Sequence, residues 1–225
     1  DFIGNVSTNA FSTAARMREA GTRCLRLGDT AGYCVPTLYQ DGVPVEPEES
    51  AIYYQAAGKE PPTIMPFPPG LKMIVGDSHA TGPPDPAFVN WRCEIAGVPT
   101  GGGRGVPRCV PKTNLLVTFT FPDCWDGQNL DSGDHKSHMA YAEYGDDGLW
   151  VCPSTHPVPV PLISLNVRYL TPGGRGVRLA SGSPWTAHAD FFNAWDQQEL
   201  AALVRHCLNE NRLCGREETA DDRSA

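Results

Sequence analysis

The segment Cys124–Tyr141, CWDGQNLDSGDHKSHMAY, concentrates side chains that ionise or bind metals. Histidines at 135 and 138 could share one face of a turn, with Asp131 or Asp134 as an oxygen ligand or as a hydrogen-bond partner of a ligand. Such a set suits copper or zinc. The segment therefore predicts a metal site that includes His135 and His138.

The same segment allows two other chemistries. Asp126, Asn129, Asp131 and Asp134 place oxygen atoms close together in a glycine-containing loop, which is a composition that suits calcium, although the spacing is not that of an EF-hand. An Asp–His pair could also act as a general base, with Tyr141 as the acid. Against all three stands a plain interpretation, because Asp and Asn next to Gly and Ser are ordinary turn formers.

A second segment, GSPWTAHADFFNAWD at 182–196, repeats the Asp and His combination. His188 and Asp190 are two positions apart, so in an extended chain they point to the same side. Phe191, Phe192 and Trp195 are expected to build the core, although an exposed tryptophan could stack on a sugar ring. We therefore expect His188 and Asp190 to face one cleft.

A third segment, CPSTHPVPVP, places His156 just after Cys152. A bond between Cys124 and Cys152 would bring His156 towards His135 and His138. The hypothesis is that these three segments line one cleft, with Asp134, His135, His138, His188 and Asp190 as its polar wall. The candidate catalytic residues are Asp131, Asp134, His138, Tyr141, His188 and Asp190, and the candidate metal ligands are His135, His138 and His188.

Strand-like runs rich in β-branched and aromatic residues must position these side chains. They lie at 51–55, 71–76, 88–93, 114–121 and 161–170. Glycine and proline punctuate the chain, and no repeat or domain boundary is visible. The pattern predicts one antiparallel β-sandwich or jelly roll with long loops over 1–214, followed by a polar tail at 215–225.

Two helices are expected beside the strands. One covers STAARMREAG, with Ser12 as N-cap and Gly21 after its end. The other covers DQQELAALVRHCLNE, with Asp196 as N-cap. Its apolar stripe should pack on the sheet, while His206 lies at the surface. The stripe consists of Leu200, Leu203, Val204, Cys207 and Leu208.

Eight cysteines fall into four close pairs, and none forms the C-x2-C spacing of a zinc ribbon. Disulfides are therefore expected at 24–34, 93–109, 124–152 and 207–214, which places the protein outside the cytosol. The net charge is −8, and no block of Lys or Arg occurs. Nucleic acid is therefore a poor partner. No apolar run is long enough to span a bilayer.

Several motifs resemble the signature blocks of a family of secreted fungal and bacterial proteins that is catalogued as a domain of unknown function. They are FPDCWDG, NLDS, DHKSHMAY, CPSTHPVPVP, HADFFNAWD, YCVPTLYQDG and PFPPGLKMIVGD. The resemblance implies His135, His138, His156, His188 and Asp190 as motif residues. Members usually carry an H-x-H motif directly before the segment that opens this chain. If that motif belongs to the site, the site is completed there.

The expected function is action on a cell-wall or environmental polysaccharide. Hydrolysis requires two carboxyl groups, and Asp131 or Asp134 paired with Asp190 is the candidate dyad. A lyase would use His138 or His188 as the base and Tyr141 as the acid. The alternative is a non-catalytic extracellular protein that binds a metal or a glycan, or that serves in assembly.

Overall fold

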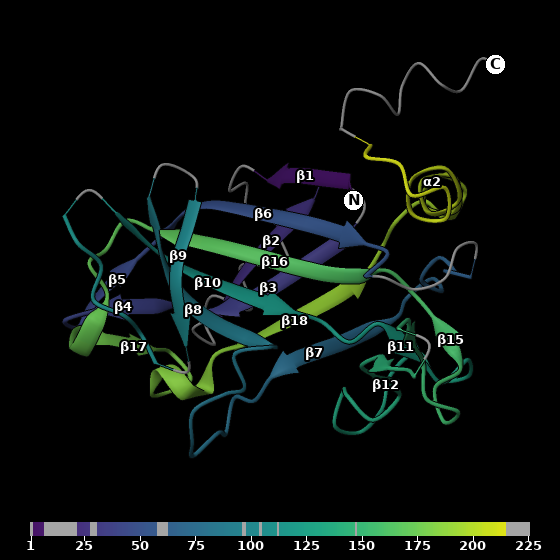
Figure 1. The fold of residues 1–225 in the computed structure, drawn as a ribbon. Helices are drawn as coiled ribbons and strands as arrows, with labels where there is room; N and C mark the ends of the chain where they lie inside the picture. The colour runs from purple at the N-terminus through teal and green to yellow at the C-terminus, as the bar shows by residue number, and fades with distance from the viewer. Residues whose placement is uncertain are drawn as a thin grey trace.

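Antiparallel pairing of short strands organises the computed structural model (Figure 1). It describes residues 2–6, 22–27, 31–57, 63–95, 98–103, 105–111, 113–146 and 148–214, with the backbone alone at 2–6, 22–27 and 31. The expected helix at 12–21 and the tail at 215–225 lie outside these ranges. Within them, every strand pair is antiparallel, and the predicted mainly β class is confirmed.

Two larger sheets carry most of the described strands. The six-stranded sheet runs in the order β1 (Phe2–Val6), β6 (Pro47–Gln55), β16 (Leu162–Tyr169), β10 (Asn114–Thr120), β8 (Val89–Ile95) and β9 (Val98–Gly103). The four-stranded sheet runs β2 (Thr22–Leu27), β3 (Ala31–Pro36), β18 (His188–Asn193) and β7 (Lys72–Gly76). The five runs that were expected to be strands correspond to β6, β7, β8, β10 and β16.

Three small sheets complete the described strands. β17 (Val177–Leu179) pairs with β4 (Leu38–Gln40), which pairs with β5 (Val43–Val45). β11 (Cys124–Trp125) lies between β12 (Met139–Ala140) and β15 (Val158–Pro159). β13 (Glu143–Tyr144) and β14 (Trp150–Val151) form a two-stranded sheet. The short 3-10 helices are η1 (Gly174–Gly176) and η2 (Pro184–Thr186).

The buried faces of the two larger sheets meet in one hydrophobic core. Tyr33 of β3 and Tyr54 of β6 are both fully buried, and their hydroxyl oxygens are 2.6 Å apart. The ring of Tyr33 also packs against Phe191 of β18, at a centroid separation of 5.3 Å. Because the core takes one side of each strand, alternate residues of β7 and β18 are left on the opposite side.

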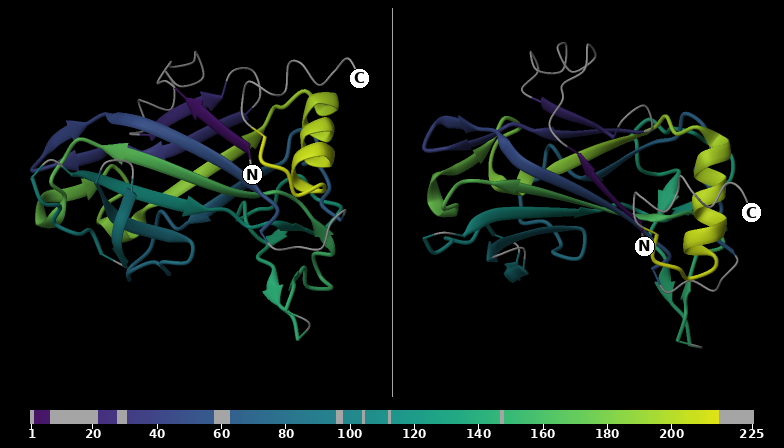
Figure 2. Two further views of the ribbon diagram at one scale, coloured as in Figure 1. Left: turned by 45° about the horizontal axis from the view of Figure 1, so that its top comes forward. Right: turned by 90° about the horizontal axis from the view of Figure 1, so that it is seen from above.

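The C-terminal helix begins as expected. The carboxylate of Asp196 accepts hydrogen bonds from the backbone N–H groups of Gln198 and Glu199, and α2 covers Gln197–Leu203. It continues as a π-helical turn, η3 (Val204–Leu208). The five residues of the predicted apolar stripe are buried, and His206 is exposed. Figure 2 shows α2 at one end of the strands.

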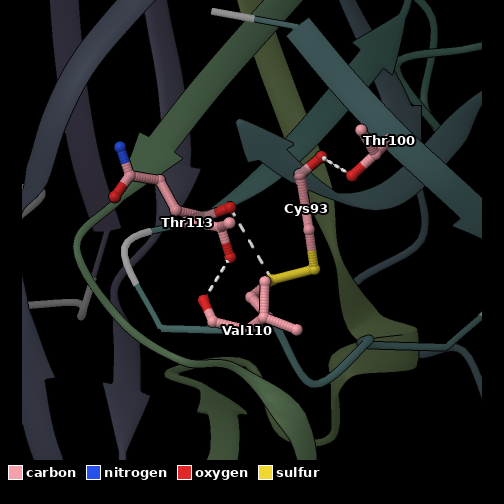
Figure 3. The surroundings of a disulfide bond; sticks show 6 residues. Cys93, Thr100, Val110 and Thr113 are labelled. Atoms are coloured by element: carbon pink, nitrogen blue, oxygen red, sulfur yellow. Dashed lines mark hydrogen bonds between the residues drawn. A yellow bond between two sulfur atoms is a disulfide. The ribbon is translucent and has the colours of Figure 1, made fainter. Parts of the chain in front are cut away.

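Disulfides connect segments that are close in the chain. The pairs Cys93–Cys109, Cys124–Cys152 and Cys207–Cys214 are bonded as predicted. The first ties β8 to the segment after β9, where Thr100 donates a hydrogen bond to the Cys93 carbonyl at 3.2 Å (Figure 3). Cys34 is disulfide-bonded, and Cys24 lies opposite it in the register of β2 and β3. The side chain of Cys24 is outside those described, so the 24–34 bond stays a prediction.

Candidate functional site

His188 and Asp190 occupy the face of β18 that points away from the core. Along β18 the side chains alternate between half-buried and buried, so His188, Asp190 and Phe192 share the outer face. In the antiparallel register, Asp190 lies opposite Ile74 of β7, and His188 lies opposite Gly76. The predicted same-side arrangement of His188 and Asp190 is therefore confirmed.

The Asp-rich loop reaches this face by lying along β7, the last strand in the described order of its sheet. The backbone N–H of Ile74 donates to the His135 carbonyl at 3.1 Å, and that of Lys72 donates to the Leu130 carbonyl at 2.9 Å. The ammonium of Lys136 bonds to the Gly76 carbonyl. The loop thus covers the edge of β7 with its own backbone groups.

Asp131 forms a charged cluster beside this edge. Its Oδ1 accepts a hydrogen bond from Nδ1 of His135 at 2.6 Å, and its Oδ2 lies 3.6 Å from the ammonium of Lys72. Desolvation opposes ionisation of Asp131. The hydrogen bonds from His135 and Ser132, with the charges of His135 and Lys72, nevertheless hold its pKa below the ordinary value. Asp131 is therefore a carboxylate over most of the pH range.

Asp190 has the opposite electrostatic setting on the same face. Burial raises the pKa of its carboxyl group, and the charges of His188 and His135 lower it only in part. Those contributions also show that His135, from the loop, lies within electrostatic range of Asp190. The structure thus brings His135, His188 and Asp190 together, as the sequence predicts.

The two imidazoles on this face are oriented in the same way. Nδ1 of His188 lies 2.8 Å from the Thr186 carbonyl oxygen, and Nδ1 of His135 bonds to the Asp131 carboxylate. Both partners are pure acceptors, so each Nδ1 carries a proton. No described residue bonds to either Nε2. These atoms are the basic positions of the neutral rings.

His138 lies inside the loop and not on the outer face. Its side chain is 2% exposed, and its Nε2 donates to the Lys72 carbonyl at 2.7 Å. Its Nδ1 lies 2.8 Å from the hydroxyl oxygen of Ser132. Both ring nitrogens are therefore occupied by bonds that hold the loop. This position fits a structural residue better than the metal ligand or catalytic base that the spacing suggested.

Asp134 forms the turn that precedes His138. One oxygen, Oδ1, accepts from the backbone N–H groups of Lys136 and Ser137 and from the hydroxyls of Ser132 and Ser137, at 2.7–3.0 Å. The Ser137 amide bond is the largest of the effects that lower its pKa. The turn-forming interpretation of this residue therefore describes its contacts.

Asp126 has a similar turn-forming role. Its Oδ1 accepts from the N–H groups of Gln128 and Asn129, and its Oδ2 accepts from the Asn129 side chain at 2.7 Å. His156 lies close to the loop, as expected, because its Nε2 is 3.1 Å from the Ser137 carbonyl oxygen. Among the described residues, no group of three or more His, Cys, Asp or Glu side chains has the arrangement of a metal site.

Tyr141 has no open position for proton transfer. Its hydroxyl donates to the Thr120 carbonyl at 2.9 Å, and its ring stacks on Phe88 at a centroid separation of 3.9 Å. Burial raises its pKa, and the nearby charges of Asp123 and Asp85 raise it further. A neutral, hydrogen-bonded phenol of this kind fits a structural role better than that of a catalytic acid.

Three groups near the site or at the surface were missed from the sequence. Lys72 contacts Asp131, but a single lysine beside a strand carries no local signal. Trp185 is 40% exposed on η2, three residues before His188. Tyr144 and Trp150 are 67% and 44% exposed and pair across β13 and β14, which form a hairpin that projects from the body (Figure 2). Alternation along EY and WV is too short to predict that pair.

No helix in the described ranges is long and apolar enough to cross a membrane. Neither the curated proteins nor the solved structures include a match to this chain. A family described as a domain of unknown function, DUF1996, matches residues 1–195. Most of the described fold, including the loop, β7 and the outer face of β18, falls within this match. The chain therefore belongs to the DUF1996 family, as its signature motifs suggested.

Proposed function

We propose that this protein is an extracellular enzyme that hydrolyses a cell-wall or environmental polysaccharide. Asp190 is the general acid, and Asp131 is the second carboxyl group of the dyad. The disulfides support the extracellular setting, because such bonds persist in oxidising compartments.

One observation carries this proposal. Asp131 and Asp190 come from distant parts of the chain to the same side of β7, and their surroundings shift their pKa values in opposite directions. A protonated and an ionised carboxyl group at one pH are what acid–base cleavage of a glycosidic bond requires. Asp134 fits the second role less well, because its Oδ1 is occupied by the turn.

The chemistry assigns a role to each group. Asp190 gives its proton to the glycosidic oxygen as the bond between that oxygen and the anomeric carbon breaks. Asp131 either takes a proton from the attacking water or attacks the anomeric carbon itself, and the separation of the carboxyl groups around the bound sugar decides which. His135 holds Asp131 in place, and Trp185 offers a ring on which a sugar can stack.

Elimination is less well supported. A lyase needs a free base and a phenol that can release its proton. His138 has both ring nitrogens bonded, and the Tyr141 hydroxyl donates to a carbonyl. His188 alone keeps a basic nitrogen on the outer face.

The test is the release of reducing ends from a panel of β-glucan, chitin, xylan and polygalacturonate. We expect Asp190→Asn and Asp131→Asn to lower the rate on the cleaved polymer by about 100-fold or more. The matched control is Asp146→Asn, which changes an exposed aspartate of the β13–β14 turn. If Asp190→Asn keeps the wild-type rate, or if Asp146→Asn loses as much, the assignment of the dyad is wrong.

Metal binding is a second candidate function, and one observation favours it. Histidines that bind metals commonly donate their other N–H to a carboxylate or a carbonyl, as His135 and His188 do. The test is metal analysis of the purified protein and of His135→Ala and His188→Ala. His79→Ala, which changes an exposed histidine far along the chain, is the control. A metal content that neither variant lowers would exclude these ligands.

A further inference from the structure

A surface pocket lies at β4 and β17, two strands that Figure 1 labels beside each other. Its volume is ≈ 490 Å³, within the range of roughly 300–1,000 Å³ that is common for small-ligand sites. The walls come from the turn after β4, from the segment at 106–108 and from the glycine-rich segment at 172–176. None of these residues belongs to the Asp131 and Asp190 face.

Close approach of backbone segments fixes the shape of this pocket. Gly173 has a φ of 65°, and a Cβ atom there would lie 2.5 Å from the Pro107 carbonyl oxygen. A Cβ atom on Gly176 would lie 2.0 Å from Oδ1 of Asp41. The backbone N–H of Asp41 donates to the Gly176 carbonyl at 2.9 Å. Glycine is therefore required on this wall, and the pocket is formed before any ligand arrives.

Two arginines in the wall have no partner of their own. Arg108 and Arg175 are exposed, and neither guanidinium has a hydrogen bond or an ion pair within the described part of the chain. This is notable in a protein with a net charge of −8, where carboxylates outnumber cations. Planar guanidinium groups bind carboxylates through paired hydrogen bonds.

One carboxylate in the same wall is held in a fixed orientation. Oδ2 of Asp41 accepts a hydrogen bond from the side-chain amide of Gln40 at 3.1 Å. The other end of that amide accepts from the buried hydroxyl of Thr171 at 2.6 Å, which fixes which end faces Asp41. Asp41 therefore presents an oriented acceptor for hydroxyl groups beside the two cations.

We propose that this pocket binds a sugar residue that carries a carboxylate, namely a uronate unit of a polysaccharide. Arg108 and Arg175 bind the carboxylate, and Asp41 accepts hydroxyl groups of the ring. Two guanidinium groups and one carboxylate give the three charged side chains of the wall a net charge of +1, which one uronate balances. The proposal concerns binding alone, and it does not require the Asp190 site to be catalytic.

The test is isothermal titration of the folded protein with a galacturonate trimer and a glucuronate trimer. We expect at least one of them to bind, and Arg108→Gln and Arg175→Gln each to weaken that binding at least tenfold. The matched control is Arg178→Gln, an exposed arginine of β17 outside the pocket, which should change the affinity less than twofold. The melting temperatures should stay the same, because neither pocket arginine has a partner to lose.

Four results would overturn the proposal. They are no binding of either uronate trimer, full affinity in both pocket variants, equal loss in Arg178→Gln, and a neutral galactose trimer that binds as well as galacturonate. Inorganic phosphate or a sulfated trisaccharide that binds as tightly as the uronates would also reject the carboxylate assignment. Asp190→Asn should bind like the wild type, so loss of hydrolysis and loss of pocket binding can be told apart.

Discussion

The imidazole of His138 bonds to the backbone of Lys72 across 66 positions of sequence, with Nε2 2.7 Å from the Lys72 carbonyl oxygen. Because a carbonyl only accepts, Nε2 carries a proton, and the bond joins the Asp-rich loop to β7. Two backbone bonds from β7 to Leu130 and His135 continue the same contact. The position of Asp131 beside the sheet therefore depends on a buried histidine.

Replacing His138 should destabilise the protein. His138→Ala leaves the Lys72 carbonyl and the Ser132 hydroxyl without this partner in a buried place, and we expect a loss of about 2–4 kcal/mol in the free energy of unfolding. Urea denaturation measures it. His79→Ala, at an exposed histidine, should change stability by less than about 0.5 kcal/mol. Unchanged stability in His138→Ala would show that the loop is held by other contacts.

The rate of hydrolysis should have two pH limits set by the dyad. Asp131 must be ionised, and its lowered pKa places the acid limit below the ordinary aspartate value. Asp190 must be protonated, and its raised pKa places the alkaline limit above that value. Activity is therefore expected between the two pKa values and should fall on both sides. Initial rates across the pH range measure this, and a single limit would contradict the assignment.

Asp190→Asn should raise stability at neutral pH while it removes activity. The folded-state pKa of Asp190 is raised, so the folded protein holds this proton more tightly than the unfolded chain does. Its contribution is therefore present below the unfolded pKa and is lost as the pH rises through the folded pKa. Asparagine stays neutral at every pH. We expect a higher melting temperature at pH 7 and little difference at pH 3. A lower melting temperature at pH 7 would mean that the ionised carboxylate is well solvated or paired.

The long disulfide loop should contribute more stability than the short one. Cys124 and Cys152 are 28 positions apart, and Cys207 and Cys214 are 7 apart. Loop-closure entropy predicts losses of about 3.5 and about 2.5 kcal/mol when each pair is changed to alanine. Denaturation of the two double variants tests this order. The reverse order would show that native packing around the bonds outweighs chain entropy.

The buried tyrosine pair should make the protein sensitive to alkali. Burial raises the pKa of Tyr54 to about 12, while hydrogen bonds with Tyr33 and Trp195 lower it in part. Between pH 10 and 12 the unfolded chain has lost this proton and the folded chain keeps it, so the free energy of unfolding falls as the pH rises. Tyr54→Phe should flatten that fall. Tyr144→Phe, at an exposed tyrosine, should leave the slope unchanged.

The sequence by itself determined the features that depend on neighbouring residues. Three disulfides join cysteines that are close in the chain, where a short loop is easy to close. Asp196 caps α2 because its side chain reaches the first free N–H groups of the helix. The alternation in HADFFN was enough to put His188 and Asp190 on one side of β18.

Only the tertiary structure decided which members of the Asp-rich loop reach that side. His135 and His138 are three positions apart, yet His135 bonds to Asp131 on the outer face while His138 is buried against Lys72. Spacing in a turn does not fix these directions. They follow from the antiparallel pairing of β7 with β18, and from the loop that bonds along β7. Such pairings join residues far apart in the chain and are decided by how the whole sheet packs on the core.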